Sequence, residues 1–398
     1  MNEPSRSAFM PREELIEKTV SRKQMSIGLP HDLQDGEKRV ALTPEAVKIL
    51  TDAGNEVFME RGAGEDAGFA DVEYSDNGAV VTDSPDIVYG CDILIKIAPF
   101  THAEASRLKG GQTVISFMNA ATMGEDTLST LMRRRVTALA SEKIKDSDGI
   151  LPVVESMSEI SGITSVLLAS EYLSTTSGGK GVMLGGVTGV TPTEVIIIGA
   201  NTAGEYAARA ALGLGAIVRV FDTSVHRLRN FQNLLGQRLY TSTFHPQVLQ
   251  KALKSADVLI GALSTDILMP WFYVTEDMVQ GMKQGSVIID LSIDTGGCVE
   301  TAEPRAVKDP IYEKHGVIHY SAWNLPSRVP KTASIALSNV FRPLMQEIAD
   351  AGGIIPMLRF NNGLRNGVYI FNGILTNEVL GQKFGILSKD LNLLLAAF

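Results

Sequence analysis

The sequence predicts an α/β protein built from two Rossmann-like, doubly wound domains, the first discontinuous, with a helical C-terminal tail. A chain of 398 residues is long enough for two or three domains. Short apolar segments alternate with helical patterns, which favours largely parallel sheets. In mid-chain, a β-branched segment leads into a glycine turn and a helix of small residues, Val195 to Ala216.

Composition excludes several functional classes. The chain is 44% hydrophobic and 20% charged, with a net charge of −9, so we expect no broad nucleic-acid surface. The one dense basic run, Arg133–Arg135, is typical of a solvated helix end. No apolar run reaches the roughly 18 residues of a membrane helix, and residues 1–24 do not resemble a secretory signal. Cys91 and Cys298 predict neither a metal site nor a disulfide framework, and we expect a cytoplasmic protein.

The N-terminal half begins with a polar arm, residues 1–24, and then alternates strands and helices. Thr43 caps and Pro44 starts a helix that Gly54 ends. The expected strands are 25–30, 56–64, 92–97, 113–118 and 136–144.

A long helix over 156–174 is predicted to bridge the two domains. A loop rich in glycine and threonine, 175–194, follows it. The second strand series comprises 195–200, 217–222, 256–263 and 286–292. We therefore predict a substrate domain from residues 1–155 plus 322–398 and a dinucleotide-binding domain from 156–321.

The glycine turn predicts nucleotide binding. The turn and the first turn of its helix comprise Gly199, Asn201, Thr202, Ala203 and Gly204. Backbone N–H groups and the helix dipole in such a turn bind a pyrophosphate, and Gly204 permits close packing of helix and strand. Asn201 replaces the usual second glycine. Asparagine tolerates left-handed backbone, so the turn can form, although the side chain crowds the pyrophosphate.

Asp222 ends the next strand, 23 residues after Gly199. Its carboxylate would accept hydrogen bonds from both ribose hydroxyls and would repel a 2′-phosphate, which favours NAD over NADP. Arg227 either lies over the adenine or sits on the helix surface. An empty crevice in a doubly wound fold is the alternative to nucleotide binding.

Several long segments resemble the alanine dehydrogenase family, with the N-terminal domain of nicotinamide nucleotide transhydrogenase as a more distant likeness. They are KRVALTPEAVKILTDAGNEVFMERGAG, DILIKIAPF, SMSEISG, GGKGVMLGGVTGV, GSVIIDLSIDTGGCVET and KHGVIHYSAWNLPSRVPKTASIALSN. The resemblance spans about Ser26 to Asn339; the tail after Arg342 does not fit it. It implies an NAD-dependent enzyme that interconverts L-alanine with pyruvate and ammonia, and a homo-oligomer, often a hexamer.

The resemblance places the substrate cations at Arg39 and Lys96. The Arg39 guanidinium can grip a carboxylate with two hydrogen bonds; the alternative is a surface ion pair with Glu37 or Glu45. Lys96 lies at the carboxyl end of an apolar strand, where it could polarise the keto or imine group. The alternative is an edge lysine whose charge reaches solvent.

The same resemblance implies that Asp294 transfers protons or stabilises the imine. The alternative is that Asp294 only caps the turn before Gly296. The family's catalytic histidine position is Asn119. An amide donates and accepts hydrogen bonds but transfers no proton near neutral pH, so Asn119 is expected to orient. His102 is a conceivable substitute, although an exposed loop histidine is the simpler interpretation.

Two further residues are expected near the cofactor. Ser158 could touch it from the bridging helix, or serve as a helix N-cap. Asn324, in AWNLP, could contact nicotinamide or substrate.

The sequence thus predicts an NAD-linked alanine dehydrogenase. Two other hypotheses stay open because of Asn119 and Asn201. One is a related amino- or imino-acid dehydrogenase, or a transhydrogenase-like protein. The other is a nucleotide sensor with an inactive site.

Overall fold

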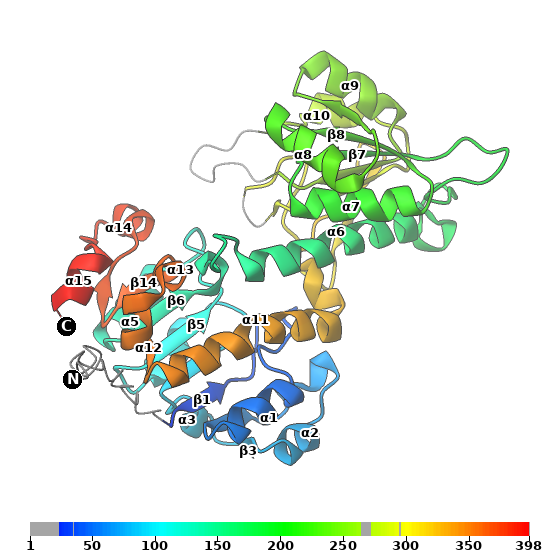
Figure 1. Cartoon of the computed structure of the whole chain (residues 1–398). Coiled ribbons are helices and arrows are strands. Elements are labelled where there is room, and N and C mark those ends of the chain that lie inside the picture. Colours follow the sequence, from blue (N-terminus) through cyan, green and yellow to red (C-terminus); the bar gives the residue numbers. More distant parts are fainter. Residues whose placement is uncertain (1–23, 35, 264–271, 294–295, 398) are drawn as a thin grey trace, which may run out of the picture.

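A computed structural model describes residues 24–34, 36–263, 272–293 and 296–397 of the chain. The chain forms two lobes, each built around one sheet, with the long helix α6 running between them (Figure 1). This is the α/β architecture that the sequence predicts.

The first lobe holds an eight-stranded sheet in the order β15-β14-β6-β5-β4-β1-β2-β3. Strands β1 to β6 pair in parallel, and the β14–β15 hairpin joins the edge of β6 in antiparallel fashion. The parallel strands are β1 (Ser26–Leu29), β2 (Glu56–Glu60), β3 (Val80–Thr82), β4 (Ile93–Ile95), β5 (Thr113–Ser116) and β6 (Thr137–Ala140). Their carboxyl ends therefore meet at one edge.

The second lobe holds a seven-stranded sheet in the order β12-β13-β11-β10-β7-β8-β9. All its pairs are parallel except β12 with β13. The strands are β7 (Glu194–Ile198), β8 (Ile217–Phe221), β9 (Tyr240–Ser242), β10 (Val258–Gly261), β11 (Val287–Asp290), β12 (Ile311–Lys314) and β13 (Val317–Tyr320). The order reverses at β7, which is where a doubly wound sheet binds ligands.

Helices cover both faces of each sheet, and each face has its own buried apolar cluster. As predicted, Thr43 caps α1 by accepting a hydrogen bond from the amide of Ala46, and Pro44 starts the helix. In the first lobe the helices are α1 (Pro44–Asp52), α2 (Asp71–Asp76), α3 (Pro85–Val88), α4 (His102–Arg107) and α5 (Glu125–Arg133). In the second they are α7 (Thr202–Gly213), α8 (Val225–Leu235), α9 (Pro246–Ser255) and α10 (Glu276–Gln280).

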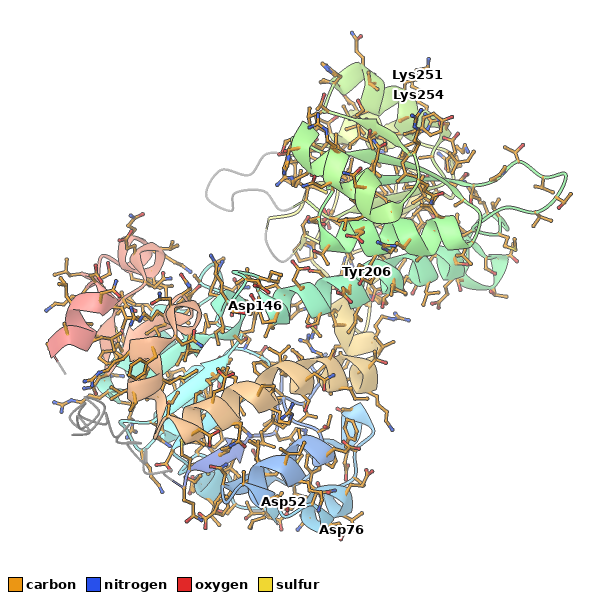
Figure 2. The ribbon with its side chains drawn as sticks, in the orientation of Figure 1. Asp52, Asp76, Asp146, Tyr206, Lys251 and Lys254 are labelled. Atoms are coloured by element: carbon orange, nitrogen blue, oxygen red, sulfur yellow. The ribbon has the colours of Figure 1, made fainter. Side chains whose placement is uncertain are left out.

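The bridging helix α6 spans Pro152–Leu173 and so begins four residues earlier than the sequence suggested. It packs closely on α7 at Gly162, where an added Cβ would lie 2.3 Å from the carbonyl oxygen of Ala203. Tyr206 of α7 lies at the same contact, beside α6 (Figure 2). The close approach joins the helix to the second lobe, while its first turn reaches the first lobe.

The C-terminal tail is helical in part, but it also supplies two strands that the sequence analysis did not expect. The long helix α11 (Pro330–Asp350) crosses back to the first lobe (Figure 1). Helices α12 (Ile354–Phe360), α13 (Asn362–Arg365), α14 (Glu378–Phe384) and α15 (Leu391–Ala397) follow, with β14 (Val368–Phe371) and β15 (Ile374–Leu375) between them. Asn372 and Gly373, both at positive φ, form the two-residue turn of this hairpin.

Within the part of the chain that the structure describes, no helix combines the length and apolarity needed to cross a membrane.

Candidate active site

Most of the candidate residues lie at the carboxyl ends of parallel strands. At the edge of the first sheet, Arg39, Lys96 and Asn119 follow β1, β4 and β5. At the edge of the second sheet, Gly199 and Asp222 follow β7 and β8, and Asn324 follows β13. The two edges touch: the Asn324 side-chain amide donates to Glu37 Oε2 at 3.0 Å, and Ser327 Oγ accepts from the amide of Lys38 at 2.8 Å.

The glycine turn after β7 requires both of its glycines. Gly199 has φ +113°, and a Cβ there would lie 2.9 Å from the carbonyl carbon of Ala262. A Cβ on Gly204 would lie 2.0 Å from the carbonyl oxygen of Gly199. The expected close packing of this helix on its strand is confirmed, and the first turn of α7, with Ala203 buried in it, faces the edge of the sheet.

The turn forms without the usual second glycine, but not in the way that the sequence predicted. The expected left-handed backbone at Asn201 is wrong. Its φ is −111°, an extended conformation, because Gly199 takes the left-handed position instead. The Asn201 side chain caps α7 by accepting from the amide of Gly204 at 3.0 Å, and its Nδ2 donates to the carbonyl of Ala262. The side chain thus belongs to the scaffold of the turn.

Asp222 is fully buried beneath the turn. One carboxylate oxygen accepts from the amide of Ala200 at 2.8 Å; the other accepts from the amide of Ser224 at 2.7 Å and from Arg227 Nε at 2.9 Å. Arg227 lies on the surface of α8, the second of its two expected positions, and its half-exposed guanidinium forms an ion pair with Asp222. The pair fixes the carboxylate where β8 ends.

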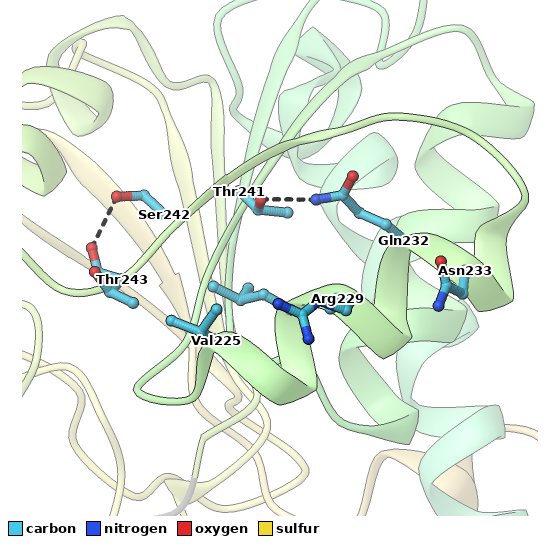
Figure 3. A pocket seen from close by; sticks show the side chains of 8 residues that line it. Val225, Arg229, Gln232, Asn233, Thr241, Ser242 and Thr243 are labelled. Atoms are coloured by element: carbon cyan, nitrogen blue, oxygen red, sulfur yellow. Dashed lines mark hydrogen bonds between the residues drawn. The ribbon is translucent and has the colours of Figure 1, made fainter.

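Two cavities open near this turn. The smaller, of about 200 Å³, is lined by Ala200, Asn201, Thr202 and Arg227 among others, so it belongs to the nucleotide turn. The larger, of about 360 Å³, lies between α8 and β9 and is lined by Val225, Arg229 and 241–243 (Figure 3). No predicted site residue lines the larger cavity, and we do not assign it to the site.

Helix α6 ties the cofactor turn to the substrate lobe. Thr202 Oγ1 donates to Glu155 Oε2 at 2.6 Å, and Arg39 Nη1 lies 3.3 Å from the sulfur of Met157. Ser158 sits half-buried in the second turn of the helix, so its alternative role as an N-cap is wrong.

Arg39 is gripped by Glu37, one of the two partners considered from the sequence. Its Nε and Nη2 donate to the two Glu37 oxygens at 2.8 and 2.6 Å. The pair is not on the surface, since the Arg39 and Glu37 side chains are only 11% and 5% exposed. Nη1, on the other side of the guanidinium, faces α6. The arginine is thereby fixed between Glu37 and the first turns of α6.

Glu37 holds several donors besides Arg39. Its oxygens also accept from the backbone amides of Lys38 and Arg39 and from Asn324, which has the left-handed φ of 65° that asparagine tolerates. Burial alone would raise the pKa of Glu37, but the charge and hydrogen bonds of Arg39 outweigh it and lower that pKa. Glu37 is therefore an ionised hub between the two sheet edges.

Lys96 does not face a cleft in this structure, contrary to expectation. Its side chain is 1% exposed, and Nζ lies 2.9 Å from Asp32 Oδ1 and 2.5 Å from Glu104 Oε1. Asp32 also accepts from the amides of Ile97 and Ala98 at 3.1 and 3.0 Å. The Lys96 ammonium is thus bound by two carboxylates of its own lobe. Its expected role, polarisation of the substrate, stays a prediction.

Two members of this buried cluster, Lys96 and Glu104, are stabilised in their charged forms. Burial disfavours the ammonium of Lys96, but the two carboxylates outweigh burial and raise the pKa of Lys96. The pKa of Glu104 is lowered, because its contact with Lys96 outweighs its own burial. Burial raises the pKa of Asp32, which shares the same cation. The cluster joins the loop after β1 to the end of β4 and to α4.

Asn119 follows β5 in a left-handed conformation, with φ 38°. Its amide donates to Glu142 Oε1 at 3.0 Å, and the amide of Met118 donates to both oxygens of the same carboxylate at 3.2 Å. Glu142 lies just beyond β6, and burial raises its pKa. His102 starts α4, where its Nδ1 meets Thr130 Oγ1 and the carbonyl of Asp126, so it packs against α5.

Asp294 lies outside the described residues. Asp290, four residues earlier, is buried at the end of β11. Its carboxylate accepts from the hydroxyl of Ser292 at 2.6 Å and from the amides of Cys298 and Val299 at 2.8 and 3.2 Å.

The sequence analysis missed three acidic residues of this region: Glu142, Glu155 and Asp32. Glu142 had a detectable signal, because it follows a predicted strand of a parallel sheet, as Arg39 and Asn119 do. Asp32 had the same signal, since it lies three residues after β1, whereas Glu155 had none, because its partner Thr202 is 47 residues away.

The two doubly wound sheets and the glycine turn at the switch point of the second sheet define a two-lobed dinucleotide-binding enzyme class. Comparisons with known proteins specify it further. Residues 28–161 match the model "Alanine dehydrogenase/PNT, N-terminal domain", and residues 165–378 match "Alanine dehydrogenase/PNT, C-terminal domain". The chain therefore belongs to the alanine dehydrogenase/PNT family.

Individual relatives agree with this assignment. An alanine dehydrogenase of Staphylococcus saprophyticus is 35% identical over 368 residues, covering 92% of this chain and 99% of the relative. Alanine dehydrogenase 2 of Staphylococcus aureus (strain USA300) is 36% identical over 361 residues, covering 90% and 96%. A solved L-alanine dehydrogenase superposes with a TM-score of 0.84 at 36% identity, covering 91% of this chain and 99% of that one. A transhydrogenase from Sinorhizobium meliloti, at 22% identity, covers 88% and 99% and shares the fold with a TM-score of 0.75.

Proposed function

We propose that this protein is an NAD-dependent alanine dehydrogenase, which converts L-alanine, NAD⁺ and water into pyruvate, ammonium, NADH and a proton, and runs in reverse. Family membership over nearly the whole chain supports the reaction. The observation that carries the substrate assignment is Arg39, a nearly buried guanidinium held bidentately by Glu37 at the junction of the two lobes.

Arg39 binds the carboxylate of alanine in this proposal. Glu37 occupies Nε and Nη2 and shows the forked geometry that a carboxylate adopts on this guanidinium. Nη1, directed toward Met157 of α6, is the donor left for the substrate. Because Asn324 of the second lobe binds the same Glu37, the substrate site lies next to the cofactor lobe.

The residues of the second lobe fit NAD. Gly199 and Gly204 leave a cradle that any Cβ would fill, and the first turn of α7, with Thr202 and Ala203, offers backbone donors to a pyrophosphate. Asp222, the acidic residue at the end of β8, is assigned to the ribose hydroxyls by its place in the strand–turn–helix pattern, and its charge opposes a 2′-phosphate. Its carboxylate is bound by Ala200, Ser224 and Arg227 in this structure, so a ribose hydroxyl would replace one of these donors. NAD, when bound, supplies the hydride acceptor for Cα of the amino acid.

Proton handling falls to Asp294 in this proposal. Oxidation leaves an imine, to which water adds before ammonia departs, and each step moves a proton near the amine. Asn119 donates a hydrogen bond through its side-chain amide and orients the imine or keto group. Lys96 polarises the keto or imine group in this proposal, which requires its ammonium to exchange one of its two contacts, with Asp32 or Glu104, for the substrate.

We also propose a homo-oligomer, with a hexamer as the expected state. Ile163 and Leu167 are one turn apart on the outer face of α6 and are 42% and 58% exposed. An apolar pair on a helix face suits a subunit contact. Light scattering coupled to size-exclusion chromatography measures the mass directly.

The test of the enzymatic proposal is alanine-dependent NADH formation by the purified protein and by Arg39→Met. Charge-assisted hydrogen bonds contribute about 1.5–3 kcal/mol, so R39M should lower kcat/KM for alanine by about 10- to 100-fold, with NAD binding intact. Arg61→Met is the matched control, since Arg61 is exposed and pairs with Asp83. Absence of turnover in a protein that binds NADH would contradict the proposal.

A further inference from the structure

The corner that carries Asn119 is unusually constrained. β5 ends at Ser116, and Asn119 turns the chain with φ 38°. The Asn119 carbonyl accepts from the amides of Thr122 and Met123 at 3.1 and 3.0 Å. A non-glycine residue in this conformation persists only where its surroundings hold it there.

A negative charge holds the amide side of this corner. The buried Glu142 carboxylate accepts from the amides of Met118 and Asn119, as described above. No cation is found within salt-bridge distance of Glu142 among the described residues. The backbone N–H groups of the corner are therefore its partners.

A positive charge holds the carbonyl side. Lys383 Nζ lies 3.2 Å from the carbonyl oxygen of Ala120, 2.6 Å from that of Ala121 and 3.0 Å from that of Met123. An ammonium has three donors, and these three contacts use all of them. Lys383 lies on α14, the red helix at the upper edge of the first lobe in Figure 1, more than 250 residues from the corner in sequence.

We propose that Lys383 is a positioning residue for the Asn119 corner, and that the C-terminal tail thereby takes part in shaping the active site. Successive peptide groups at the corner present N–H groups to Glu142 and C=O groups to Lys383, so opposite charges clamp opposite sides of one turn. The clamp keeps Asn119 in its left-handed conformation and fixes where its side-chain amide points.

This inference rests on the proposed function for its catalytic consequence, but the clamp itself is a property of the fold. An orienting amide acts only through its direction, because it transfers no proton. A small displacement of a positioning group lowers a rate by as much as about 100-fold. Loss of the tail lysine should therefore affect the rate through the direction of the Asn119 amide.

The experiment compares Lys383→Met with Lys383→Arg in the full-length protein. Arginine keeps the charge and the donors, whereas methionine keeps only the aliphatic stem. Lys383 is exposed, so neither change opens the core. Lys389→Met is the matched control, an exposed lysine six residues further along the same tail.

Two readouts are measured: kcat and KM for alanine and for NAD, and amide hydrogen exchange over 117–124. In K383M we expect kcat to fall by about tenfold with the KM for NAD unchanged, and exchange at 118–123 to accelerate by about tenfold. K383R should recover most of the wild-type kcat and most of the wild-type protection from exchange. K389M should match the wild type in both measurements. An active K383M with wild-type exchange over this segment overturns the inference.

Failure of the two proposals can be told apart. A wild-type protein without alanine turnover refutes the enzymatic proposal, while the exchange comparison still tests the clamp. If K383M does not fold, Lys383→Gln, which keeps a neutral donor, replaces it: intermediate exchange supports the clamp, and wild-type exchange together with wild-type kcat refutes it.

Discussion

Replacement of Lys96 by methionine is the sharpest test of the buried charge cluster. Lys96 is 1% exposed and lies between Asp32 and Glu104. Methionine has a similar length and apolar stem, so packing is nearly preserved. The change removes the cation and leaves two carboxylates facing one another below the loop that leads to Arg39.

The expected cost is large because the cluster is buried. Removing one partner of a buried ion pair costs about 3–5 kcal/mol, since the remaining charge keeps its desolvation penalty. At about 1.4 kcal/mol per factor of ten, the folding equilibrium should fall by about 100- to 3,000-fold. An exposed pair is worth about 0–1 kcal/mol. Lys48 and Asp52, 3.8 Å apart and 58% and 66% exposed, are such a pair.

Urea denaturation of wild type, K96M, K96M/E104Q and the control K48M measures these differences. We expect K48M to lie within about 1 kcal/mol of wild type. K96M should lose several times more, and the added Glu104→Gln should restore part of the loss by removing one of the two facing charges. Lys96 lowers the pKa of Glu104 in the folded protein. The contribution of this ion pair to folding stability is therefore fully present above pH 4.5, the ordinary pKa of a glutamate, and declines as the pH falls below that value.

The stability gap between wild type and K96M should therefore narrow in acid. Two results would refute the structural role of Lys96. One is a loss of unfolding free energy in K96M as small as that in K48M, and the other is a loss that stays constant from neutral pH to below pH 4.5.

Other predictions follow from single contacts. Glu37→Gln should destabilise the protein by about 1.5–3 kcal/mol at neutral pH, as measured by urea unfolding. Because the pKa of Glu37 is lowered in the folded state, the difference should shrink below pH 4.5. Gly162→Ala should lower the thermal midpoint, since its Cβ would meet the carbonyl of Ala203 at 2.3 Å, whereas Gly213→Ala, with nothing within 4 Å, should not. Asp222→Asn should weaken NADH binding by about tenfold in a fluorescence titration while reducing discrimination against NADPH; unchanged affinity for both would contradict the ribose assignment.

Much of the fold was predictable because its signals are local. Short apolar segments between turn residues predicted nine of the strands but not β3, β9, β12 and β13, and Thr43 with Pro44 predicted the start of α1. The β14–β15 hairpin was missed although Asn372-Gly373 is a strong hairpin signal, because the tail was judged on its helical segments.

The site was predictable only in position. The carboxyl ends of parallel strands indicated where Arg39, Lys96 and Asn119 would lie. Their partners could not be read from the sequence, since Asp32 is 64 residues from Lys96 and Lys383 is 264 residues from Asn119. Asn201 shows the same limit within one turn. Its backbone is extended because Gly199, two residues earlier, takes the positive φ that the turn requires.

The pairing of charges at this edge has a consequence for substrate choice. Lys96 is neutralised within the lobe, and two of the three guanidinium nitrogens of Arg39 face Glu37. What remains for a guest is one N–H on each terminal nitrogen, on Nη1 beside the sulfur of Met157 and on Nη2 beside Glu37. In the proposed function these donors bind the single carboxylate of alanine. A second carboxylate on a longer amino acid would lie near the ionised Glu37, and like charges disfavour binding, so the proposed arrangement favours a small monocarboxylic amino acid over aspartate or glutamate.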